Sequence, residues 1–285
     1  MTLFVGLDIG GTKLMAAAGD GGREIVRRIR RETPTALEEG LRSLHAMVEA
    51  VAAGEDIGGI GAAVGGPLDW RTGVVSPLHQ PSWREVPLKE IMEERWECPF
   101  WVDVDTNVAA LGEYAALSKP VSRLLYITVS TGMGGGLVVD GRLYRGADGG
   151  HPEVGHQAIN SRCTYPERVW CECGAKDCVE AFVSGNGIRR LYGKPAHELS
   201  AAEWEEVAWN LGRGLRNCAA LYVPDLIALG GGVATGGGEP FIATVEAVMK
   251  EELKIVPAPK VVLSTLGYDT ALYGALIVAQ KGLGE

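Results

Sequence analysis

The sequence has no apolar run long enough to cross a lipid bilayer. Its most apolar stretches, such as LIALGGGVATGGG at residues 226–238, are interrupted by glycine well before the ~20 residues that a membrane-spanning helix needs. The first residues, MTLFVGLDIGGTK, lack the basic start and the long apolar segment of a secretory signal. We therefore predict a cytoplasmic protein that makes no contact with a membrane.

An excess of positive charge is also missing. The chain carries 27 Lys and Arg against 36 Asp and Glu, a formal net charge of −9, so no basic field is available to bind nucleic acid. One local exception is REIVRRIRRE, with five arginines between Arg23 and Arg31. We interpret it as a strand in which Ile25 and Ile29 pack inward and the arginines stay in solvent. An anion or nucleic-acid patch is the alternative.

Cysteine is sparse, with six in 285 residues, which is too few for a disulfide scaffold in the reducing cytoplasm. Cys98 and Cys218 lie among apolar residues and are predicted to be core residues. The segment CECGAKDC, from Cys171 to Cys178, has the spacing of a metal site, with a regulatory disulfide as the alternative. Cys163 lies outside that spacing and is expected to be a free thiol.

Glycine is abundant and gathers at three places, each directly after a short apolar run that predicts a buried strand. The runs are LFVGL, RLLYITV and DLIAL. Backbone amides in a glycine turn can approach phosphate closely because no Cβ intervenes, although hairpin turns, bulges and strand-to-helix turns also use glycine. The candidate nucleotide contacts are Asp8, Gly10, Gly11, Thr12 and Lys13 in the first turn, Thr131, Gly132 and Gly134 in the second, and Gly230, Gly231 and Gly232 in the third.

Strand-like and helical segments alternate along the chain, which is typical of the α/β class. Thr33-Pro34 is expected to open a helix whose apolar face runs from Leu37 to Val51, and Ser200 with Glu203 forms a capping box before another helix. GLVVDGRLY predicts a hairpin with an Asp-Gly turn, so the sheets are mixed. We expect an N-terminal domain at 1–117, completed by a C-terminal helix at 270–285, and a second domain at 118–269.

The segment WVDVDTNVAALGEY is the candidate for acid–base chemistry. Asp105 follows an apolar strand and can accept the proton of an alcohol during phosphoryl transfer. The alternative is that Asp105 and Asn107 only cap a helix that begins near Asn107. Asp8, at the end of the first strand, is a candidate ligand of Mg²⁺, directly or through water, with an Asx turn as its alternative.

In order and spacing, these motifs resemble those of the ROK family of bacterial sugar kinases over essentially the whole chain. GLDIGGTK and STGMGGG are similar to the two phosphate motifs of the family, and LIALGGGV to its adenosine-side motif. DVDTNVAALGE resembles E-N-D-A-N-A-A-A-L-G-E, which places Asp105 on the catalytic base and Asn107 on the second Asn. The resemblance implies two duplicated actin/hexokinase-like (ribonuclease H-like) domains with mixed sheets around an interdomain cleft.

The segments HPEVGH and CECGAKDCVE resemble the family's E-I-G-H and C-x-C-G-x-x-G-C-L-E. The resemblance implies that His156, Cys171, Cys173 and Cys178 bind zinc. Three thiolates and an imidazole fill a tetrahedron, so the zinc would be structural. The sugar contacts that the resemblance implies are Gly66, Asp105, Asn107, Glu153, His156 and Glu180.

The resemblance implies an ATP- and Mg²⁺-dependent hexose kinase that transfers phosphate to the 6-OH of glucose or a similar hexose. It also implies a homodimer, which is common in the family. The sequence departs from the family at PLHQPSW, where His79 or Gln80 stands in place of an Asn-Leu pair, and at Val104, where Asn is usual. The long segment between His156 and Cys171 favours fructokinase, mannokinase or N-acetylhexosamine kinase branches as alternatives. A non-catalytic sugar-sensing regulator is the alternative of another class, disfavoured because LDIGGTK begins at residue 7.

Overall fold

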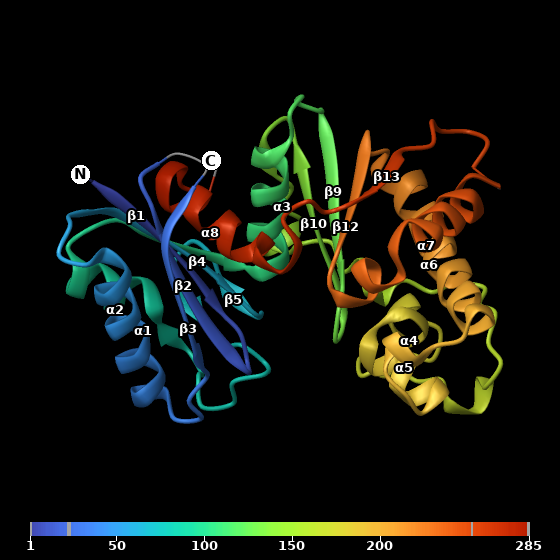
Figure 1. Ribbon diagram of the computed structural model, residues 1–285, viewed down its shortest axis with the longest axis horizontal. Helices are drawn as coiled ribbons and strands as arrows, with labels where there is room; N and C mark the ends of the chain where they lie inside the picture. The colour runs from blue at the N-terminus through green and yellow to red at the C-terminus, as the bar shows by residue number, and fades with distance from the viewer. Residues whose placement is uncertain (1, 22–23, 252, 284–285) are drawn as a thin grey trace. The chain divides into compact units, whose positions relative to one another are not determined.

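A computed structural model of the chain describes residues 2–21, 24–251 and 253–283. It divides into two compact units (Figure 1). Unit 1 comprises the described residues of 1–118, 141–150 and 269–285, and unit 2 comprises those of 119–140 and 151–268. The segment 141–150 therefore packs with unit 1, although the chain on either side of it belongs to unit 2. Within the described ranges, no helix is both long and apolar enough to span a bilayer.

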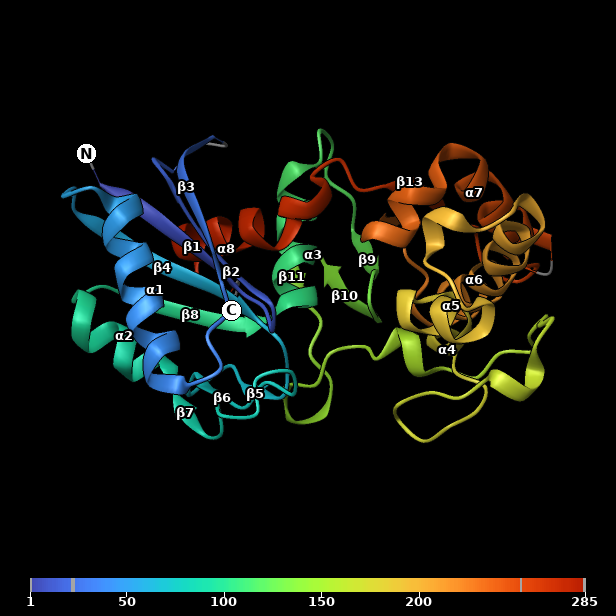
Figure 2. The same cartoon turned by 60° about the horizontal axis from the view of Figure 1, so that its bottom comes forward.

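Unit 1 is built on a mixed five-stranded sheet in the order β3-β2-β1-β4-β8. The strands are β1 (Leu3–Ile9), β2 (Lys13–Gly19), β3 (Ile25–Glu32), β4 (Ile57–Val64) and β8 (Phe100–Val104). β1, β2 and β3 pair antiparallel, whereas β4 pairs parallel with both β1 and β8. A small antiparallel sheet accompanies it, made of β5 (Leu68–Asp69), β6 (Val74–Val75) and β7 (Val86–Pro87) (Figure 2).

At β1, β2 and β4 both faces of this sheet are buried, so side chains that alternate along a strand enter two different cores. In β2, Leu14 and Ala16 belong to the core cluster that includes residues of α1 and α2, while Met15 and Ala17 pack with Leu272 of α8. The helices of unit 1 are α1 (Leu37–Ala52), α2 (Leu88–Trp96), α3 (Asp105–Ala116) and α8 (Thr270–Lys281). The C-terminal helix thus completes the N-terminal sheet.

Glycines let α8 lie directly on the backbone of the sheet. A Cβ added to Gly61 in β4 would stand 2.2 Å from the carbonyl oxygen of Ala275, so no larger residue fits there. The same is true where α3 crosses α8, because a Cβ on Gly274 would stand 2.0 Å from the carbonyl oxygen of Val108. Close helix packing of this kind holds α3, and with it Asp105, against the sheet.

The second mixed sheet has the order β11-β10-β9-β12-β13; β9, β10, β12 and β13 belong to unit 2, whereas β11 falls in the segment 141–150. Its strands are β9 (Arg123–Val129), β10 (Met133–Val139), β11 (Arg142–Leu143), β12 (Leu226–Gly230) and β13 (Lys260–Leu263). The α-helices are α4 (Val179–Val183), α5 (Gly185–Tyr192), α6 (Ala201–Tyr222) and α7 (Gly232–Glu251), the last interrupted at Gly238. Short 3₁₀ turns complete the chain at η1 (Ala147–Gly149), η2 (Val154–His156), η3 (Pro166–Arg168), η4 (Ala196–Glu198) and η5 (Gly267–Asp269).

Several local predictions are confirmed. Ser200 and Glu203 form the expected capping box at the start of α6. Asp140 and Gly141 both have positive φ, 49° and 82°, as a two-residue hairpin turn requires. Cys98 and Cys218 are buried.

The arginine-rich segment forms β3, with Ile25 and Ile29 half-buried and Arg28, Arg30 and Arg31 exposed, as predicted. Arg27 is half-buried and pairs with Glu55, with 2.6 Å between Nη2 and Oε1. Arg23, which the prediction also included, lies outside the described residues. The observed strand favours the packing interpretation over an anion patch.

Two predicted helix starts are wrong. The first helix begins at Leu37 and not at Thr33-Pro34, because Thr33 belongs to the preceding turn: its Oγ1 donates to the carbonyl of Gly10 and its N–H to that of Thr12. The helix after β8 begins at Asp105 itself and not near Asn107. Asp105 therefore lies in the first turn of α3, with its backbone already helical.

Candidate active site

The first glycine turn, residues 10–12, joins β1 to β2. Gly10 N–H donates to the carbonyl of Lys13 at 3.0 Å, and Thr33 Oγ1 donates to the carbonyl of Gly10 at 2.6 Å. Asp8 lies on the sheet, opposite Met15 in the register with β2. The backbone and Thr33 supply these closing hydrogen bonds, which favours a role for Asp8 other than an Asx turn.

The segment PLHQPSW packs on this turn. A Cβ on Gly11 would stand 2.8 Å from Cβ of His79, so His79 lies directly against the turn, and its own side chain is exposed. Gln80 is 5% exposed. Of the two residues that replace the family's Asn-Leu pair, His79 is therefore the one that a ligand can reach.

Asp8 lies in a concentration of negative charge. Burial raises the pKa of Asp8 to about 6; Lys13 opposes the shift, and the carboxylates of Asp105 and Asp269 add to it. A buried carboxyl group with two further carboxylates acting on it favours a bound cation, which would lower the pKa of Asp8. Asp269 was not predicted from the sequence, because nothing in its neighbourhood marks it and only the packing of α8 brings it to the N-terminal sheet.

Asp105 is the first residue of α3, directly after β8. Its Oδ1 accepts a hydrogen bond from Thr106 N–H at 2.7 Å. Val104 is the N-cap residue, and no side chain of the described residues caps the helix there. Asn107 is buried and donates from Nδ2 to Oδ1 of Asp103 at 3.2 Å. Neither residue is the N-cap of α3, although Oδ1 of Asp105 does satisfy one N–H of the first turn.

Gly66, a predicted sugar contact, lies in the same unit and near the end of β8. A Cβ added to Gly66 would stand 3.8 Å from Cγ2 of Val104, and its carbonyl accepts from Leu78 N–H at 3.0 Å. Gly66, Asp105 and Asn107 are thus all residues of unit 1. The predicted sugar contacts Glu153, His156 and Glu180 are residues of unit 2.

The second glycine turn, residues 130–132, joins β9 to β10 in unit 2. Ser130 N–H donates to the carbonyl of Gly132 at 2.9 Å. From outside the hairpin, Gly185 N–H donates to Ser130 O at 2.7 Å and Asn186 N–H to Thr131 O at 3.0 Å. The start of α5 therefore supports the turn that is predicted to contact phosphate.

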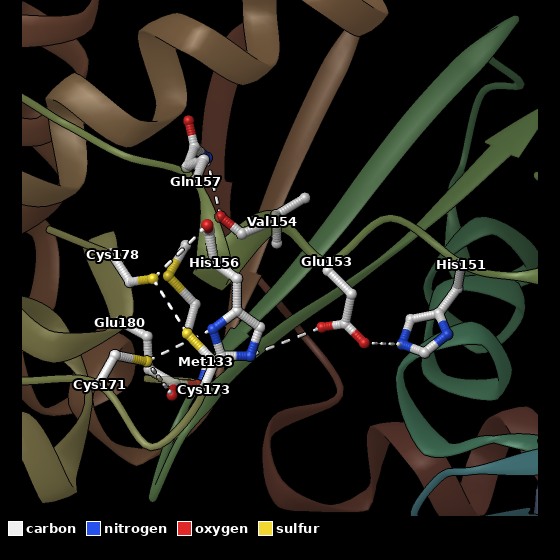
Figure 3. Close-up of polar contacts among 10 residues, drawn as sticks. All are labelled: Met133, His151, Glu153, Val154, His156, Gln157, Cys171, Cys173, Cys178 and Glu180. Atoms are coloured by element: carbon white, nitrogen blue, oxygen red, sulfur yellow. Dashed lines mark hydrogen bonds and ion pairs between the residues drawn. The ribbon is translucent and has the colours of Figure 1, made fainter. Parts of the chain in front are cut away.

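Glu180 also supports this turn. Its Oε2 accepts from Met133 N–H at 2.8 Å, and its Oε1 lies 3.6 Å from Sγ of Cys171 (Figure 3). The carboxylate stands between the cysteine cluster and the glycine turn. This contact was missed from the sequence, since 47 residues separate Met133 from Glu180.

The four predicted zinc ligands come together. The ligand atoms of His156, Cys171, Cys173 and Cys178 all lie within 4.8 Å of one another. Sγ of Cys173 is 3.4 Å from Sγ of Cys178, and Sγ of Cys171 is 3.5 Å from Nδ1 of His156. Tetrahedral zinc would place two sulfurs about 3.8 Å apart and a sulfur and a nitrogen about 3.6 Å apart. The observed donor set fits zinc.

Local backbone bonds shape this cluster. Cys171 N–H donates to Ala175 O at 2.9 Å and Gly174 N–H to Cys171 O at 2.9 Å, with Gly174 at φ 95° making the tight turn. Val179 N–H donates to Gln157 O at 3.0 Å, which brings the residue after Cys178 beside the residue after His156. Burial raises the pKa of Cys178, so that thiol keeps its proton until a metal displaces it.

Glu153 lies between two histidines (Figure 3). Its Oε1 is 3.4 Å from Nε2 of His151, and its Oε2 is 3.9 Å from Nε2 of His156. His156 therefore faces the cysteines with Nδ1 and Glu153 with Nε2. The Glu153 side chain is 58% exposed, so it is open to a ligand. His151 was not assigned a role from the sequence.

The third glycine turn, residues 230–232, joins β12 to α7 as a tight strand-to-helix connection, with Gly231 at φ 86°. A Cβ on Gly230 would stand 2.3 Å from Oη of Tyr126, and one on Gly232 would stand 2.9 Å from Oη of Tyr268. Tyr268 is 75% exposed. An exposed ring beside an open backbone turn suits a flat purine, and Tyr268 was not singled out from the sequence.

Comparison with known proteins identifies close overall similarity to sugar kinases. The profile of the ROK family matches residues 4–282. The N-acetylmannosamine kinase of Citrobacter koseri is 33% identical over 298 residues, covering 96% of this chain and 97% of that protein. A ROK hexokinase from Thermus thermophilus superposes with a TM-score of 0.82 at 30% identity, covering 98% of both chains. A ROK family glucokinase from Streptomyces griseus, solved with glucose and AMPPNP, gives 0.79 at 28% identity, covering 98% of this chain and 100% of that one.

Proposed function

Because the chain belongs to the ROK family, we propose that it is an ATP-dependent hexose kinase that transfers the γ-phosphate of ATP to a sugar hydroxyl. The observation that carries this proposal is the position of Asp105: a carboxylate at the first residue of α3, electrostatically coupled to Asp8 beside a glycine turn. The solved relatives with similar folds include a hexokinase and a glucokinase with bound glucose and AMPPNP.

In the proposed reaction, Asp105 accepts the proton of the sugar hydroxyl, the 6-OH in a hexopyranose, as its oxygen attacks the γ-phosphorus in line. A new O–P bond forms, the bond to the β-phosphate oxygen breaks, and ADP leaves. The N–H groups of the turns at residues 10–12 and 130–132 stabilise charge on the phosphate oxygens. Asp8 would hold Mg²⁺, which neutralises charge on the phosphates when bound.

The residues that we propose as sugar contacts are Gly66, Asn107, Glu153, His156 and Glu180. A carboxylate accepts hydrogen bonds from two neighbouring hydroxyls, which suits Glu153 with its exposed oxygens. His156 donates from Nε2 when its Nδ1 binds metal. Zinc at the four-residue cluster would supply structure and no open coordination position.

The experiment that tests the function is an assay of ADP release with glucose, mannose, fructose, N-acetylglucosamine and N-acetylmannosamine. We expect sugar-dependent turnover with at least one of the five and little ADP release without sugar. Activity with none of them would refute the kinase proposal. Metal analysis of the purified protein should find about one zinc per chain, the amount that a single four-ligand site binds.

A further inference from the structure

A buried ion pair lies two residues before Asp105. Asp103, in β8, is 1% exposed, and its Oδ2 accepts from Nη2 of Arg145 at 2.6 Å. The other oxygen, Oδ1, accepts from Val104 N–H at 2.6 Å and from Nδ2 of Asn107 at 3.2 Å. One carboxylate therefore bonds to the segment 141–150, to the last residue of β8 and to the first turn of α3.

Arg145 is held in place from its other side by Trp70. The guanidinium carbon of Arg145 stands 3.8 Å from the centroid of the indole ring, within the range of a cation–π contact. Gly149 lies against the edge of the same ring, since a Cβ there would stand 2.5 Å from Nε1 of Trp70. The side chain of Arg145 is only 16% exposed. The segment 141–150 is thus anchored on unit 1 at this tryptophan.

The pair has a strong energetic reason to stay closed. A buried carboxylate without a partner is costly, so Asp103 and Arg145 hold each other in one arrangement. The junction between β8 and α3 shares the same carboxylate through Val104 and Asn107. Any movement of Asp103 would therefore pass directly to the backbone that carries Asp105.

We propose that Asp103 and Arg145 are positioning residues for Asp105. The ion pair holds the β8–α3 junction so that the Asp105 carboxylate keeps the orientation needed to take the hydroxyl proton. The inference rests on the proposed role of Asp105 as the base. Neither Asp103 nor Arg145 needs to contact the substrate.

The test compares Arg145→Ala with Arg145→Lys by steady-state kinetics on the sugar that the wild-type protein uses. We expect Arg145→Ala to lower kcat by about 10- to 100-fold, since a misplacement of about 1 Å costs about 10²-fold. The KM for ATP should stay within about threefold, because the nucleotide contacts lie elsewhere. Lysine can still pair with Oδ2 of Asp103, so Arg145→Lys should recover at least about tenfold of the loss.

Arg71→Ala is the matched control. Arg71 stands over the same Trp70 ring at 4.7 Å but is exposed and does not contact Asp103. Its loss should change kcat by less than about twofold, as for most surface substitutions. Circular dichroism and zinc content show whether each variant is folded.

The outcomes separate the inference from the proposed function. If Asp105→Asn is inactive and Arg145→Ala keeps kcat within about twofold of wild type, the positioning role is wrong and the kinase proposal stands. If Asp105→Asn is fully active, the assignment of Asp105 as the base and the positioning inference are both wrong, while the kinase activity itself stands. Should Arg145→Ala not fold, Asp103→Asn combined with Arg145→Met removes both buried charges together. Loss of kcat in that folded double variant supports the inference, and wild-type kcat overturns it.

Discussion

Asp105 and His156 are the residues on which the proposed proton transfer and sugar binding depend, and different kinds of structure hold them. Asp105 follows β8, which pairs with β4 in a regular sheet, and begins a helix that packs on α8. His156 ends a single 3₁₀ turn in a segment without long elements, and its neighbours are three cysteines. Strand pairing and core packing therefore set the first position, whereas short-range backbone hydrogen bonds and the neighbouring cysteines set the second.

This difference indicates which interactions each region depends on for its structure. The position of Asp105 depends on the stability of the whole sheet of unit 1. Close to Asp105, the buried ion pair of Asp103 and Arg145 adds to that stability. In the segment 151–178, called the metal loop below, the buried members of the core cluster are Val154, Cys171 and Cys178. We therefore expect the metal loop to need a bound metal for its order, as small zinc-binding segments generally do.

The largest effect confined to one of the two regions is expected from Asp105→Asn. Asparagine keeps the shape of the side chain but cannot take the proton, so kcat should fall by about 10²- to 10⁴-fold. The metal loop is untouched, and zinc content and circular dichroism should match wild type. Full activity in this variant would show that another group is the base.

The converse variant is Cys173→Ser, which removes one ligand from the exposed edge of the cluster. Bound zinc should fall from about one to nearly none per chain. The affinity for sugar should drop about 10- to 100-fold because the metal loop loses its order. Direct sugar binding by calorimetry and metal analysis measure the two effects. Cys163→Ser is the control, since Cys163 lies outside the cluster, and it should keep both. A zinc-free Cys173→Ser with wild-type sugar affinity would contradict the proposed role of the metal.

Glu180 and Glu153 test whether the metal loop also serves the nucleotide. Glu180 accepts from Met133 N–H at the second glycine turn, whereas Glu153 faces the two histidines. Loss of a hydrogen bond to a charged group costs about 1.5–3 kcal/mol, so Glu180→Ala should raise the KM for both ATP and sugar roughly tenfold or more. Glu153→Ala should raise only the KM for sugar. Equal effects of the two variants on the KM for ATP would argue against the support that Glu180 gives to the turn.

The smallest effect should be the pH dependence that Asp8 gives to unit 1. Burial raises the pKa of Asp8 to about 6, so its carboxylate is mostly protonated below that pH. The proton then competes with Mg²⁺ for the carboxylate. The ionised fraction falls about tenfold from pH 7 to pH 5, and the apparent affinity for Mg²⁺ should fall by a similar factor. Because the folded pKa lies above the unfolded value of 3.8, the same group makes unit 1 less stable as pH rises from about 4 to 6.

Titrations of Mg²⁺ at pH 5, 6 and 7 measure this, with Asp8→Asn as the reference that lacks the titrating group. Wild-type protein with the same Mg²⁺ affinity at all three pH values would show that Asp8 does not take part in binding. Zinc content should not change over the same range in the variant relative to wild type. The comparison therefore separates the cation site of unit 1 from the metal loop of unit 2.

Patterns that depend on neighbours along the chain were sufficient to predict much of the fold. Local propensity predicts the strands that precede the glycine turns. It also predicts the Asp140-Gly141 hairpin and the Ser200–Glu203 capping box. The helix start predicted at Thr33-Pro34 failed because Thr33 bonds to the turn at Gly10, a tertiary contact that outweighs a local signal.

Three of the four predicted metal ligands lie within eight residues, so their spacing was enough to predict a metal site. Tertiary structure decided three contacts that no single segment predicts. Asp269, the N-cap residue of α8, acts on Asp8 in β1; Glu180 bonds to Met133; and Arg145 pairs with Asp103. Side-chain chemistry and short-range spacing are properties of the sequence. The burial that shifts a pKa, or that makes an ion pair costly to break, arises only when distant elements pack and exclude water.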